Sequence, residues 1–482
     1  MKDNIIAYYP YSYSANAYHG MIQEMISERY SVVDYNDLKK GIFQPKEIDA
    51  IYLNWIEDIM DESDKEMLIH FISNGVKVIW VFHNRVSHDS CKTKKCKENI
   101  LFLIHNVSDI IVLSHASVRY LYEYVEDLEK DKVHYLPHQE YIGNYGVLED
   151  KKLKATLDKA EFVFGCFGNI RPDKNIELLI KAFKNFEYNQ NCILLIVGSI
   201  DSNNYLEYLE DLKGDNKNII LIPMRIPDYM MNFYVQLADV VLLPYDLKSC
   251  MNSGVMLLAF TNKRTVICSN ICMVKEFSEE LLYIYSYLDE KDHINKISLQ
   301  MERAYIDGKA LTREKGKLLY QEIVDKNSKE IVKSTLYEII GDFSLNYAQI
   351  EERKILLEEY KDKVLWRMRY TMADALLQNI MYGNMFIEKL KENNAKKIAI
   401  YGYGKYGKML YGELIKMGLL ITCIIDQNAD NIHEKIAAYS LENLKEKLDI
   451  VIVTTVAADI NIIKQYCCKL NNNCYVISLK DV

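Results

Sequence analysis

The stretch EFVFGCFGNIRPDKNIELLIKAF occupies residues 161–183, and a second stretch, ADVVLLPYDLKSCMNSGVMLLA, occupies residues 238–259. Each stretch opens with an apolar run of strand length, passes through a turn of small and polar residues, and continues in a helical pattern. Such a turn leaves free backbone N–H groups at the start of a helix, with the positive end of the helix dipole behind them. Both turns are therefore predicted to bind phosphate.

Side chains in these two turns supply the groups that a phosphate site needs. Lys174 can place a point charge beside a phosphate, and Arg171 can offer a planar fork of donors. Asn252 and Ser253 can form hydrogen bonds with the phosphates or with a sugar. Gly168 lets the backbone come close to a ligand. The two turns are the first candidates for a nucleotide site.

Three motifs in this order resemble the donor-nucleotide half of GT-B glycosyltransferases of the group 1 type. The first is the strand, glycine, basic turn and helix of residues 161–183, the second is a strand that ends at Gly198, and the third is residues 238–259. The resemblance covers roughly residues 1–340. It implies that a nucleoside-diphosphate sugar binds in this half of the fold, while the acceptor binds in the N-terminal half.

The resemblance also implies which residues bind the donor. Arg225, after the third strand of this half, stands where such enzymes receive the base and ribose, and Glu276 stands where the ribose or sugar is met. The expected donor-binding set is Gly168, Asn169, Arg171, Lys174, Gly198, Arg225, Tyr245, Asn252, Ser253, Gly254 and Glu276.

The sequence departs from the family pattern in two places. Asn169 stands where an arginine is expected, so that Arg171 would have to take its part. Many retaining members carry two glutamates eight residues apart around the second turn, where this chain has Met251 and Ala259. The stereochemical outcome, retaining or inverting, therefore stays open.

Residues 1–150 alternate short apolar runs with helical patterns, which predicts a parallel doubly wound sheet. Ligands of such a sheet bind at the carboxyl ends of its strands, and histidines gather there. His19 stands where some inverting GT-B enzymes keep a general base. We expect His19 or His88, with or without Asp89, to take the proton of the acceptor hydroxyl. Each histidine could instead be a loop or core residue. The strands are expected at residues 4–9, 31–35, 50–55, 77–82, 109–113 and 133–136.

The segment around His88 has two further interpretations. His83, His88, Cys91 and Cys96 are zinc-ligand types, but their spacing fits no standard finger, so no metal site is expected. The lysines at positions 92–97 are either a solvated helix face or a contact with an anionic membrane surface or lipid-diphosphate acceptor.

The remainder of the chain divides into three parts. Residues 151–340 form the nucleotide-sugar domain, with strands expected at 162–167, 193–198, 219–222, 240–244, 265–269 and 282–284. Residues 341–393 read as a helical connector with an amphipathic face. Residues 394–482 read as a small Rossmann-like module, with strands near 396–401, 421–426, 449–455 and 474–478. The predicted fold class is α/β, with two doubly wound Rossmann-like domains, the connector and this third module.

The third module carries a glycine turn, with Gly402, Gly404 and Gly407, and Asp426 ends the next strand. An acid at this place can contact a ribose, so the module could bind NAD or another nucleotide. It could equally be a regulatory module, a structural unit or, as a third alternative, an oxidoreductase.

The totals restrict the class of protein. The chain has 482 residues and a formal net charge of −9, which excludes a generally basic nucleic-acid-binding surface. Eleven cysteines without a repeated spacing, no signal peptide and no apolar stretch of spanning length indicate a cytoplasmic protein with free thiols.

The resemblance to group 1 GT-B glycosyltransferases implies a glycosyltransferase that needs no metal or cofactor for transfer. It would move a sugar from a UDP- or GDP-sugar to a glycan or polyprenyl-diphosphate-linked acceptor in surface polysaccharide biosynthesis, with peripheral contact at the inner face of the plasma membrane. Two alternatives stay open. One is an NAD-dependent enzyme acting on nucleotide sugars through the C-terminal module, and the other is a non-catalytic assembly protein.

Overall fold

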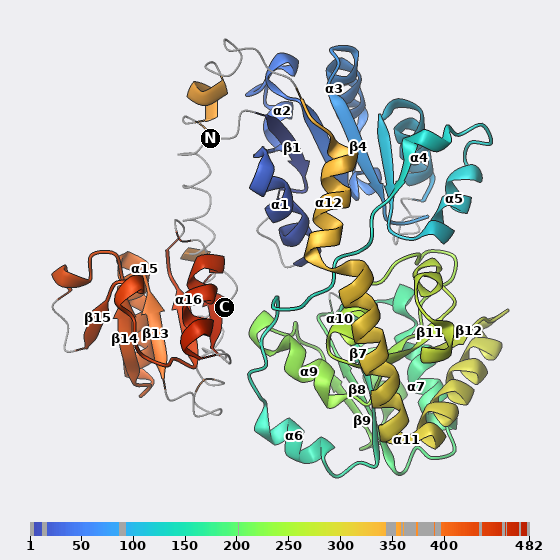
Figure 1. Ribbon diagram of the computed structural model, residues 1–482. Helices are drawn as coiled ribbons and strands as arrows, with labels where there is room; N and C mark the ends of the chain where they lie inside the picture. The colour runs from blue at the N-terminus through green and yellow to red at the C-terminus, as the bar shows by residue number, and fades with distance from the viewer. Residues whose placement is uncertain are drawn as a thin grey trace. The chain divides into compact units, whose positions relative to one another are not determined.

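The computed structural model describes residues 4–11, 17–85, 93–200, 202–343, 353–357, 360, 373–374, 390, 397–432, 436–455, 458, 460–471 and 474–479. The chain divides into two compact units. The first unit comprises Met1–Asn144, Ala160–Ile226 and Val235–Ile355, and the second comprises Tyr145–Lys159, Pro227–Tyr234 and Leu356–Val482. Each unit is described by itself below (Figure 1).

The first sheet of the first unit has six parallel strands in the order β2-β1-β3-β4-β5-β6. Four of the strands are apolar and buried along nearly their whole length, as expected for strands covered on both faces. All six fall where the sequence predicts them. The strands are β1 (Ile5–Tyr9), β2 (Ser31–Asp34), β3 (Ala50–Asn54), β4 (Lys77–Phe82), β5 (Asp109–Val112) and β6 (Val133–Tyr135).

The second sheet also has six parallel strands, in the order β12-β11-β10-β7-β8-β9. The chain therefore moves outward from β7 in one direction and from β10 in the other. All six strands again coincide with predicted runs. They are β7 (Phe162–Phe167), β8 (Cys192–Val197), β9 (Ile219–Ile222), β10 (Val240–Leu243), β11 (Thr265–Ser269) and β12 (Tyr283–Tyr285).

Helices connect the strands of both sheets (Figure 1). The connecting helices of the first sheet are α1 (Ala17–Arg29), α2 (Tyr35–Lys39), α3 (Glu62–Ser73), α4 (Thr93–Asn106) and α5 (Val118–Tyr122). Those that follow along the chain are α6 (Lys151–Leu157), α7 (Ile176–Asn185), α8 (Asn203–Lys213), α9 (Met231–Leu237), α10 (Gly254–Thr261), α11 (Glu290–Asn327) and α12 (Lys329–Ile340).

Helix α12 packs on the first sheet, although it follows the strands of the second sheet in sequence. Its apolar residues Val332, Leu336 and Ile340 lie in the same buried cluster as residues of β1 and α1. Tyr337 donates a hydrogen bond of 2.7 Å from its hydroxyl to the Met25 carbonyl. Figure 1 shows α12 beside α1. The chain that leaves the second sheet is thereby packed against the first sheet.

The third sheet lies in the second unit and has five parallel strands in the order β15-β14-β13-β16-β17. Four of these strands were predicted, and β15 (Ala437–Tyr439) was not. The core around this third sheet is built from aliphatic and cysteine side chains, Cys423 and Cys467 among them. The other elements are β13 (Ile398–Tyr401), α15 (Lys405–Lys416), β14 (Ile421–Ile425), β16 (Ile450–Val453), α16 (Ile460–Leu470) and β17 (Tyr475–Ser478).

The predicted fold class, α/β with two doubly wound six-stranded sheets and a third parallel sheet, is confirmed. Most of the helical connector predicted at residues 341–393 lies outside the described residues. Among the helices that are described, none combines the length and the apolar character needed to cross a membrane.

Candidate functional site

A cavity opens at the carboxyl ends of β7 and β10, the two strands from which the second sheet winds in opposite directions. Such a switch point leaves a crevice between the two connections, and ligands of doubly wound sheets bind there. The cavity has a volume of about 130 Å³. Its lining includes both predicted phosphate turns, represented by Gly168, Lys174, Ser253 and Gly254. The structure thus brings together two segments that lie about 80 residues apart in the sequence.

The turn after β7 depends on two glycines. Gly168 has a φ of +102°, a conformation that favours glycine. A Cβ on Gly198 would lie 1.6 Å from the Gly168 carbonyl oxygen. Gly198, which follows β8, therefore allows its backbone to pass close to the backbone of Gly168. This close approach positions the turn after β7. Ile170 N donates a 2.8 Å hydrogen bond to the Ser199 carbonyl, which holds the turn against the same loop.

The basic side chains of this turn differ in their surroundings. Arg171 forms an ion pair of 3.1 Å with Asp173 and does not line the cavity, and its buried Nε has no hydrogen-bond partner among the described residues. Asn169 lines the cavity and accepts a 2.7 Å hydrogen bond from Ser199 Oγ. Lys174 lines the cavity and makes no ion pair within the described part of the chain. Lys174 is therefore the charged group available to a ligand in the cavity.

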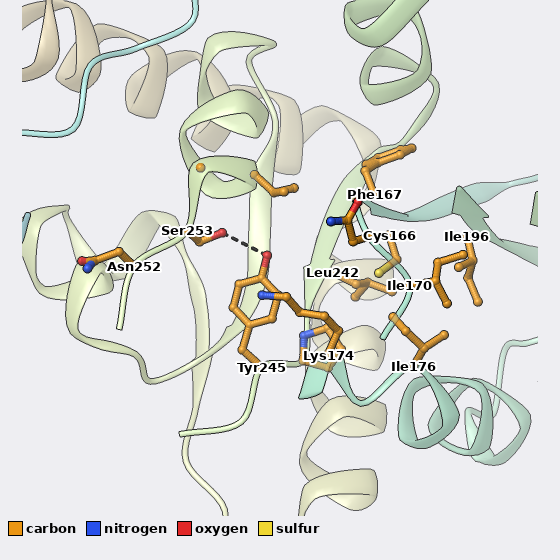
Figure 2. A pocket seen from close by; sticks show the side chains of 15 residues that line it. Cys166, Phe167, Ile170, Lys174, Ile176, Ile196, Leu242, Tyr245, Asn252 and Ser253 are labelled. Atoms are coloured by element: carbon orange, nitrogen blue, oxygen red, sulfur yellow. Dashed lines mark hydrogen bonds between the residues drawn. The ribbon is translucent and has the colours of Figure 1, made fainter. Parts of the chain in front are cut away.

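Tyr245 connects this lysine to the second turn. The Lys174 ammonium lies 3.8 Å from the centre of the Tyr245 ring, a cation–π contact. The Tyr245 hydroxyl lies 3.0 Å from Ser253 Oγ. Figure 2 shows Lys174 across the tyrosine ring, whose hydroxyl points to Ser253. Burial raises the pKa of Tyr245 well above its usual value, so the phenol stays neutral beside the cation.

The second turn is the start of α10. Ser253 caps this helix, since its hydroxyl accepts a 3.2 Å hydrogen bond from Met256 N. The preceding residue, Asn252, donates from its amide to the His83 carbonyl at 3.3 Å. A Cβ on Gly254 would lie 2.7 Å from the Tyr141 hydroxyl, so glycine keeps the helix start close to this ring. Asn252 and Gly254 thus contact His83 and Tyr141, which follow strands of the first sheet.

The cavity lining favours an anion. It contains no aspartate or glutamate, and Lys174 is its charged residue. The first backbone N–H groups of α10 add the positive end of a helix dipole. Burial raises the pKa of the Cys166 thiol, which also lines the cavity, to about 12, so this thiol stays neutral. The predicted phosphate turns therefore meet in a pocket of suitable charge.

Three histidines gather where the strands of the first sheet end. His83 follows β4 and stacks on Trp55 at 3.7 Å between ring centres. His19, on α1, lies 4.4 Å from the same indole. His138 follows β6 and lies 4.8 Å from the Tyr18 ring, which also contacts His83. The polar cluster expected at these strand ends therefore exists, with tyrosine and tryptophan rings between its imidazoles.

Burial determines the charge of this cluster. It lowers the pKa of His19 and of His138 to about 4 each. It also lowers the pKa of His83 well below its usual value, and the nearby His19 and His138 add to that shift. All three rings are therefore neutral near pH 7. His19 Nδ1 is buried and has no hydrogen-bond partner among the described residues. His88 and Asp89 lie outside the described residues.

Besides Arg171 and Gly198, two further expected donor-binding residues, Arg225 and Glu276, do not line the cavity. Arg225 is exposed on the loop after β9. Glu276 accepts hydrogen bonds of 2.8 Å from Ser114 Oγ and from His115 N, and its second oxygen lies 3.0 Å from His115 Nδ1. The Glu276 carboxylate therefore ties the end of β5 to the loop after β11. Neither residue is among those that line the cavity.

The zinc interpretation finds no support in the described residues. Cys96 is buried on α4, and no cluster of potential metal ligands occurs in the described ranges. His83 is engaged with Asn54 through Nε2 at 3.0 Å. The other two members of the proposed set, His88 and Cys91, fall outside the described residues.

The glycine turn of the third sheet also lies at a switch point, between β13 and β16. Gly407 packs so closely that a Cβ there would lie 2.1 Å from the Gly402 carbonyl oxygen, whereas Gly404 faces open space. Asp426 accepts hydrogen bonds from Tyr403 N at 2.6 Å and Asn428 N at 2.8 Å. Both carboxylate oxygens of Asp426 are therefore engaged with backbone N–H groups. Binding of NAD or another nucleotide by this module stays a prediction.

Comparisons with known proteins find a family model and several solved structures that resemble this chain. Residues 149–303 match the family model for glycosyl transferases group 1. The crystal structures of Anabaena HepE in complex with UDP and glucose and in complex with UDP-glucose both have a TM-score of 0.53, at 12% and 13% identity, and cover 70% of this chain and 99% of HepE. Sucrose-phosphate synthase from Thermosynechococcus elongatus has a TM-score of 0.51 at 15% identity, with 64% of this chain and 79% of that chain covered. No curated protein sequence matches the chain.

The solved structures share the fold, and the family match contains both phosphate turns. The GT-B fold and the enzyme class predicted from the sequence, a glycosyltransferase, are thereby confirmed. Sequence reasoning did not single out Cys166 or the contact between Tyr141 and Gly254. Cys166 lies inside the first quoted stretch. Side chains alternate between the two faces of a strand, and this alternation along β7 could have indicated the face to which Cys166 belongs.

Proposed function

We propose that this group 1 glycosyltransferase moves a sugar from a UDP-sugar to a glycan or polyprenyl-diphosphate-linked acceptor during assembly of a surface polysaccharide. The cavity at the switch point of the second sheet carries the donor part of the proposal. The preference for UDP over GDP follows HepE, whose crystal structures contain UDP and UDP-glucose. The acceptor and a place of action at the inner face of the plasma membrane follow from the resemblance of the sequence motifs.

On the donor side, departure of the nucleoside diphosphate leaves negative charge on its terminal phosphate. Lys174 and the first N–H groups of α10 can stabilise that charge, because both face the cavity. The Tyr245 ring keeps the ammonium beside the cavity without neutralising it. The members of the donor-binding set that are proposed to act here are Gly168, Asn169, Lys174, Tyr245, Asn252, Ser253 and Gly254 in the lining, with Gly198 beneath the turn.

On the acceptor side, a base has to remove a proton from the attacking hydroxyl if the reaction inverts. His19, or His88 with or without Asp89, is proposed for this part. The unpartnered Nδ1 of His19 supports the choice of that ring. With a pKa of about 4 it is a weak base, so its contribution would depend on a rise in pKa when substrate enters the site.

A ligand panel tests the proposal on the full chain. UDP, GDP, ADP, NAD and NADP are added separately, and the melting temperature is followed for the wild type, for Lys174→Ala and for Lys181→Ala. Lys181 is on the adjacent helix and pairs with Glu290 at 3.1 Å, so it serves as the control lysine. We expect UDP to raise the melting temperature of the wild type and of Lys181→Ala, and to have little effect on Lys174→Ala.

The panel also separates the two alternatives. Stabilisation by NAD or NADP alone, unchanged in Lys174→Ala, would favour an enzyme that works through the C-terminal module. Stabilisation by UDP with no release of UDP from any UDP-sugar, with or without added acceptor, would favour a non-catalytic assembly protein. Release of UDP that depends on Lys174 supports transfer.

A further inference from the structure

Two arginines beside the first sheet contact the same tyrosine ring. The guanidinium carbon of Arg85 lies 4.6 Å from the centre of the Tyr120 ring, and that of Arg119 lies 4.7 Å from the same centre. Arg85 follows β4, whereas Arg119 and Tyr120 belong to α5, which follows β5. These three residues, called the arginine cluster below, therefore lie where β4 and β5 end. Ligands of a doubly wound sheet bind at that edge.

The arginine cluster keeps a positive charge. Nη2 of Arg85 forms an ion pair of 2.5 Å with Glu123 Oε2. Arg119 is exposed and forms no ion pair with any residue that the structure describes. Nη2 of Arg119 donates a hydrogen bond of 2.9 Å to the Tyr120 hydroxyl. Two guanidinium groups thus share one carboxylate, so one positive charge is left over.

Both guanidinium groups also keep unused hydrogen-bond donors. An arginine carries five N–H donors in a fixed fork. Within the described part of the chain, the hydrogen bonds of Arg85 and Arg119 involve only the Nη2 atom of each. Contact with an aromatic face holds a guanidinium in place without occupying its edge. The remaining N–H groups are therefore preorganised for an anion.

Arg119 lies close to the second phosphate turn. Its Nη2 is 4.0 Å from Cys272 Sγ, on the loop after β11. The next residue, Met273, accepts a hydrogen bond of 3.4 Å at Sδ from Ser253 N. Ser253 lines the cavity and caps α10. Arg119 is thus connected to the donor cavity through two neighbouring residues of one loop.

Arg85 is connected to the same turn by a second route. His83, two residues before it, accepts a hydrogen bond of 3.3 Å at its carbonyl from Asn252 Nδ2. Asn252 lines the cavity. The Tyr124 hydroxyl donates a hydrogen bond of 2.8 Å to the Arg85 carbonyl, which fixes the backbone at this point. The arginine cluster therefore stands beside the donor cavity, on the side of the first sheet.

The chemistry of the cluster selects an anion with several oxygens. A guanidinium fork matches the oxygens of a phosphate, and charge-assisted hydrogen bonds of this kind are strong. The diphosphate of the donor is already assigned to Lys174 and the start of α10, beside the second sheet. The arginine cluster is therefore available to the other substrate, the acceptor.

We propose that Arg85 and Arg119, held on Tyr120, bind a phosphoryl group of the acceptor. The proposal rests on the proposed function, since it assumes that the donor occupies the cavity. It specifies the acceptor as a molecule that carries a phosphate or a diphosphate. A lipid-linked diphosphate and a sugar phosphate share this chemistry, and the two arginines position either one beside the donor.

Calorimetric titrations with three probes test the proposal on the full chain. UDP reports on the donor cavity, farnesyl diphosphate represents a lipid diphosphate, and glucose 1-phosphate represents a sugar phosphate. The two phosphate probes are titrated into protein saturated with UDP, so that they cannot bind at Lys174. The variants are Arg119→Gln, Arg119→Lys and Arg85→Gln. Arg303→Gln is the matched control, because Arg303 is an exposed arginine on α11 that contacts Gln300 at 3.2 Å.

We expect the wild type to bind at least one phosphate probe, and this affinity to fall about tenfold in Arg119→Gln and in Arg85→Gln. Arg119→Lys should recover part of the loss, because it keeps the charge without the fork. Affinity for UDP should change by less than about twofold in every variant. Selective binding of farnesyl diphosphate would support a lipid-linked diphosphate, and binding of glucose 1-phosphate would support a sugar phosphate.

Three results would overturn the arginine cluster and leave the proposed function intact. They are binding of neither phosphate probe to protein that binds UDP, an equal loss in Arg303→Gln, and a loss of UDP affinity in Arg119→Gln as large as that in Lys174→Ala. The last result would assign Arg119 to the donor. If the wild type binds no UDP, the proposed function itself fails. If Arg119→Gln does not fold, Arg85→Gln decides by the same criteria.

Discussion

The ammonium group of Lys174 lies 3.8 Å above the centre of the Tyr245 ring. An aromatic ring thus holds the ammonium without neutralising it, and its positive charge is kept. The hydroxyl of the same ring lies 3.0 Å from Ser253 Oγ at the start of α10. One buried side chain therefore positions groups from both phosphate turns.

Substitutions at Tyr245 should separate these two contacts. Tyr245→Phe keeps the ring under Lys174 and loses the contact with Ser253, so we expect UDP affinity to fall by no more than about threefold. Tyr245→Leu loses both contacts and should weaken UDP binding by about tenfold. Calorimetric titration of UDP measures both. Equal affinities for the leucine and phenylalanine variants would show that the cation–π contact does not position the lysine.

The crossing of Gly198 and Gly168 predicts a sharp effect of one methyl group. A Cβ at Gly198 would lie 1.6 Å from the Gly168 carbonyl oxygen, so Gly198→Ala must displace the first phosphate turn. We expect a loss of about 3 kcal/mol in the free energy of unfolding, together with loss of UDP binding. Gly412→Ala is the control, because no atom lies within 4 Å of a Cβ there and the residue is in helix α15. Chemical denaturation should show that control to be at least as stable as the wild type.

Glu276 should act in stability and have little part in binding. Its carboxylate accepts hydrogen bonds from Ser114 Oγ and His115 N, which leaves little of it for a ribose. Glu276→Ala should lower the free energy of unfolding by about 1–3 kcal/mol and change UDP affinity by less than about threefold. Glu279→Ala, whose partner Lys275 is a surface residue, is the matched control and should be nearly neutral. A selective loss of UDP affinity in Glu276→Ala, without loss of stability, would instead place this residue at the nucleotide.

A buried carboxyl in the first domain predicts a pH dependence of stability. Glu57 is fully buried with its Oε2 accepting a 3.1 Å hydrogen bond from Trp80 Nε1, and burial raises its pKa to about 8. In the unfolded chain the usual value is 4.5, so between these two pH values the folded state holds a proton that the unfolded state has lost. Stability from this group is therefore complete below pH 4.5 and is lost as the pH rises toward 8.

Glu57→Gln removes the ionisation and keeps the shape of the side chain. Relative to the wild type, its free energy of unfolding should rise between pH 5 and pH 8, by an amount on the order of 2–4 kcal/mol. Glu62→Gln, at a largely exposed position on α3, should show no such change. A constant difference between Glu57→Gln and the wild type over this range would contradict the burial of an ionisable carboxyl at Glu57.

The sequence was most informative where the structure depends on residues that are close together in the chain. Strands buried on both faces read as unbroken apolar runs, so all twelve strands of the first two sheets could be placed. The two phosphate turns were predicted because each is a contiguous strand, turn and helix start. The meeting of these turns at one cavity followed from the parallel order of the strands. β15 escaped prediction because it is three residues long and begins with an exposed alanine.

Contacts between distant segments could not be predicted from local pattern. Glu276 and Ser114 are 162 positions apart, and nothing near either residue signals the hydrogen bond between them. The same holds for Asn252 and the His83 carbonyl, 169 positions apart. Trp55 adopts a positive φ of 50° at the end of β3, and its stacking on His83 depends on the neighbouring strand. The acceptor side of the site was therefore predicted as a set of residues without its geometry.

The central claim is that the cavity between the two phosphate turns binds the diphosphate of a UDP-sugar. The most direct measurement is a calorimetric titration of UDP into the full chain and into Lys174→Ala, with Lys181→Ala as control. We expect saturable binding by the wild type and the control, and a loss of at least about tenfold in affinity for Lys174→Ala. Binding of UDP that is unchanged in Lys174→Ala, or no binding by the wild type at all, would contradict it.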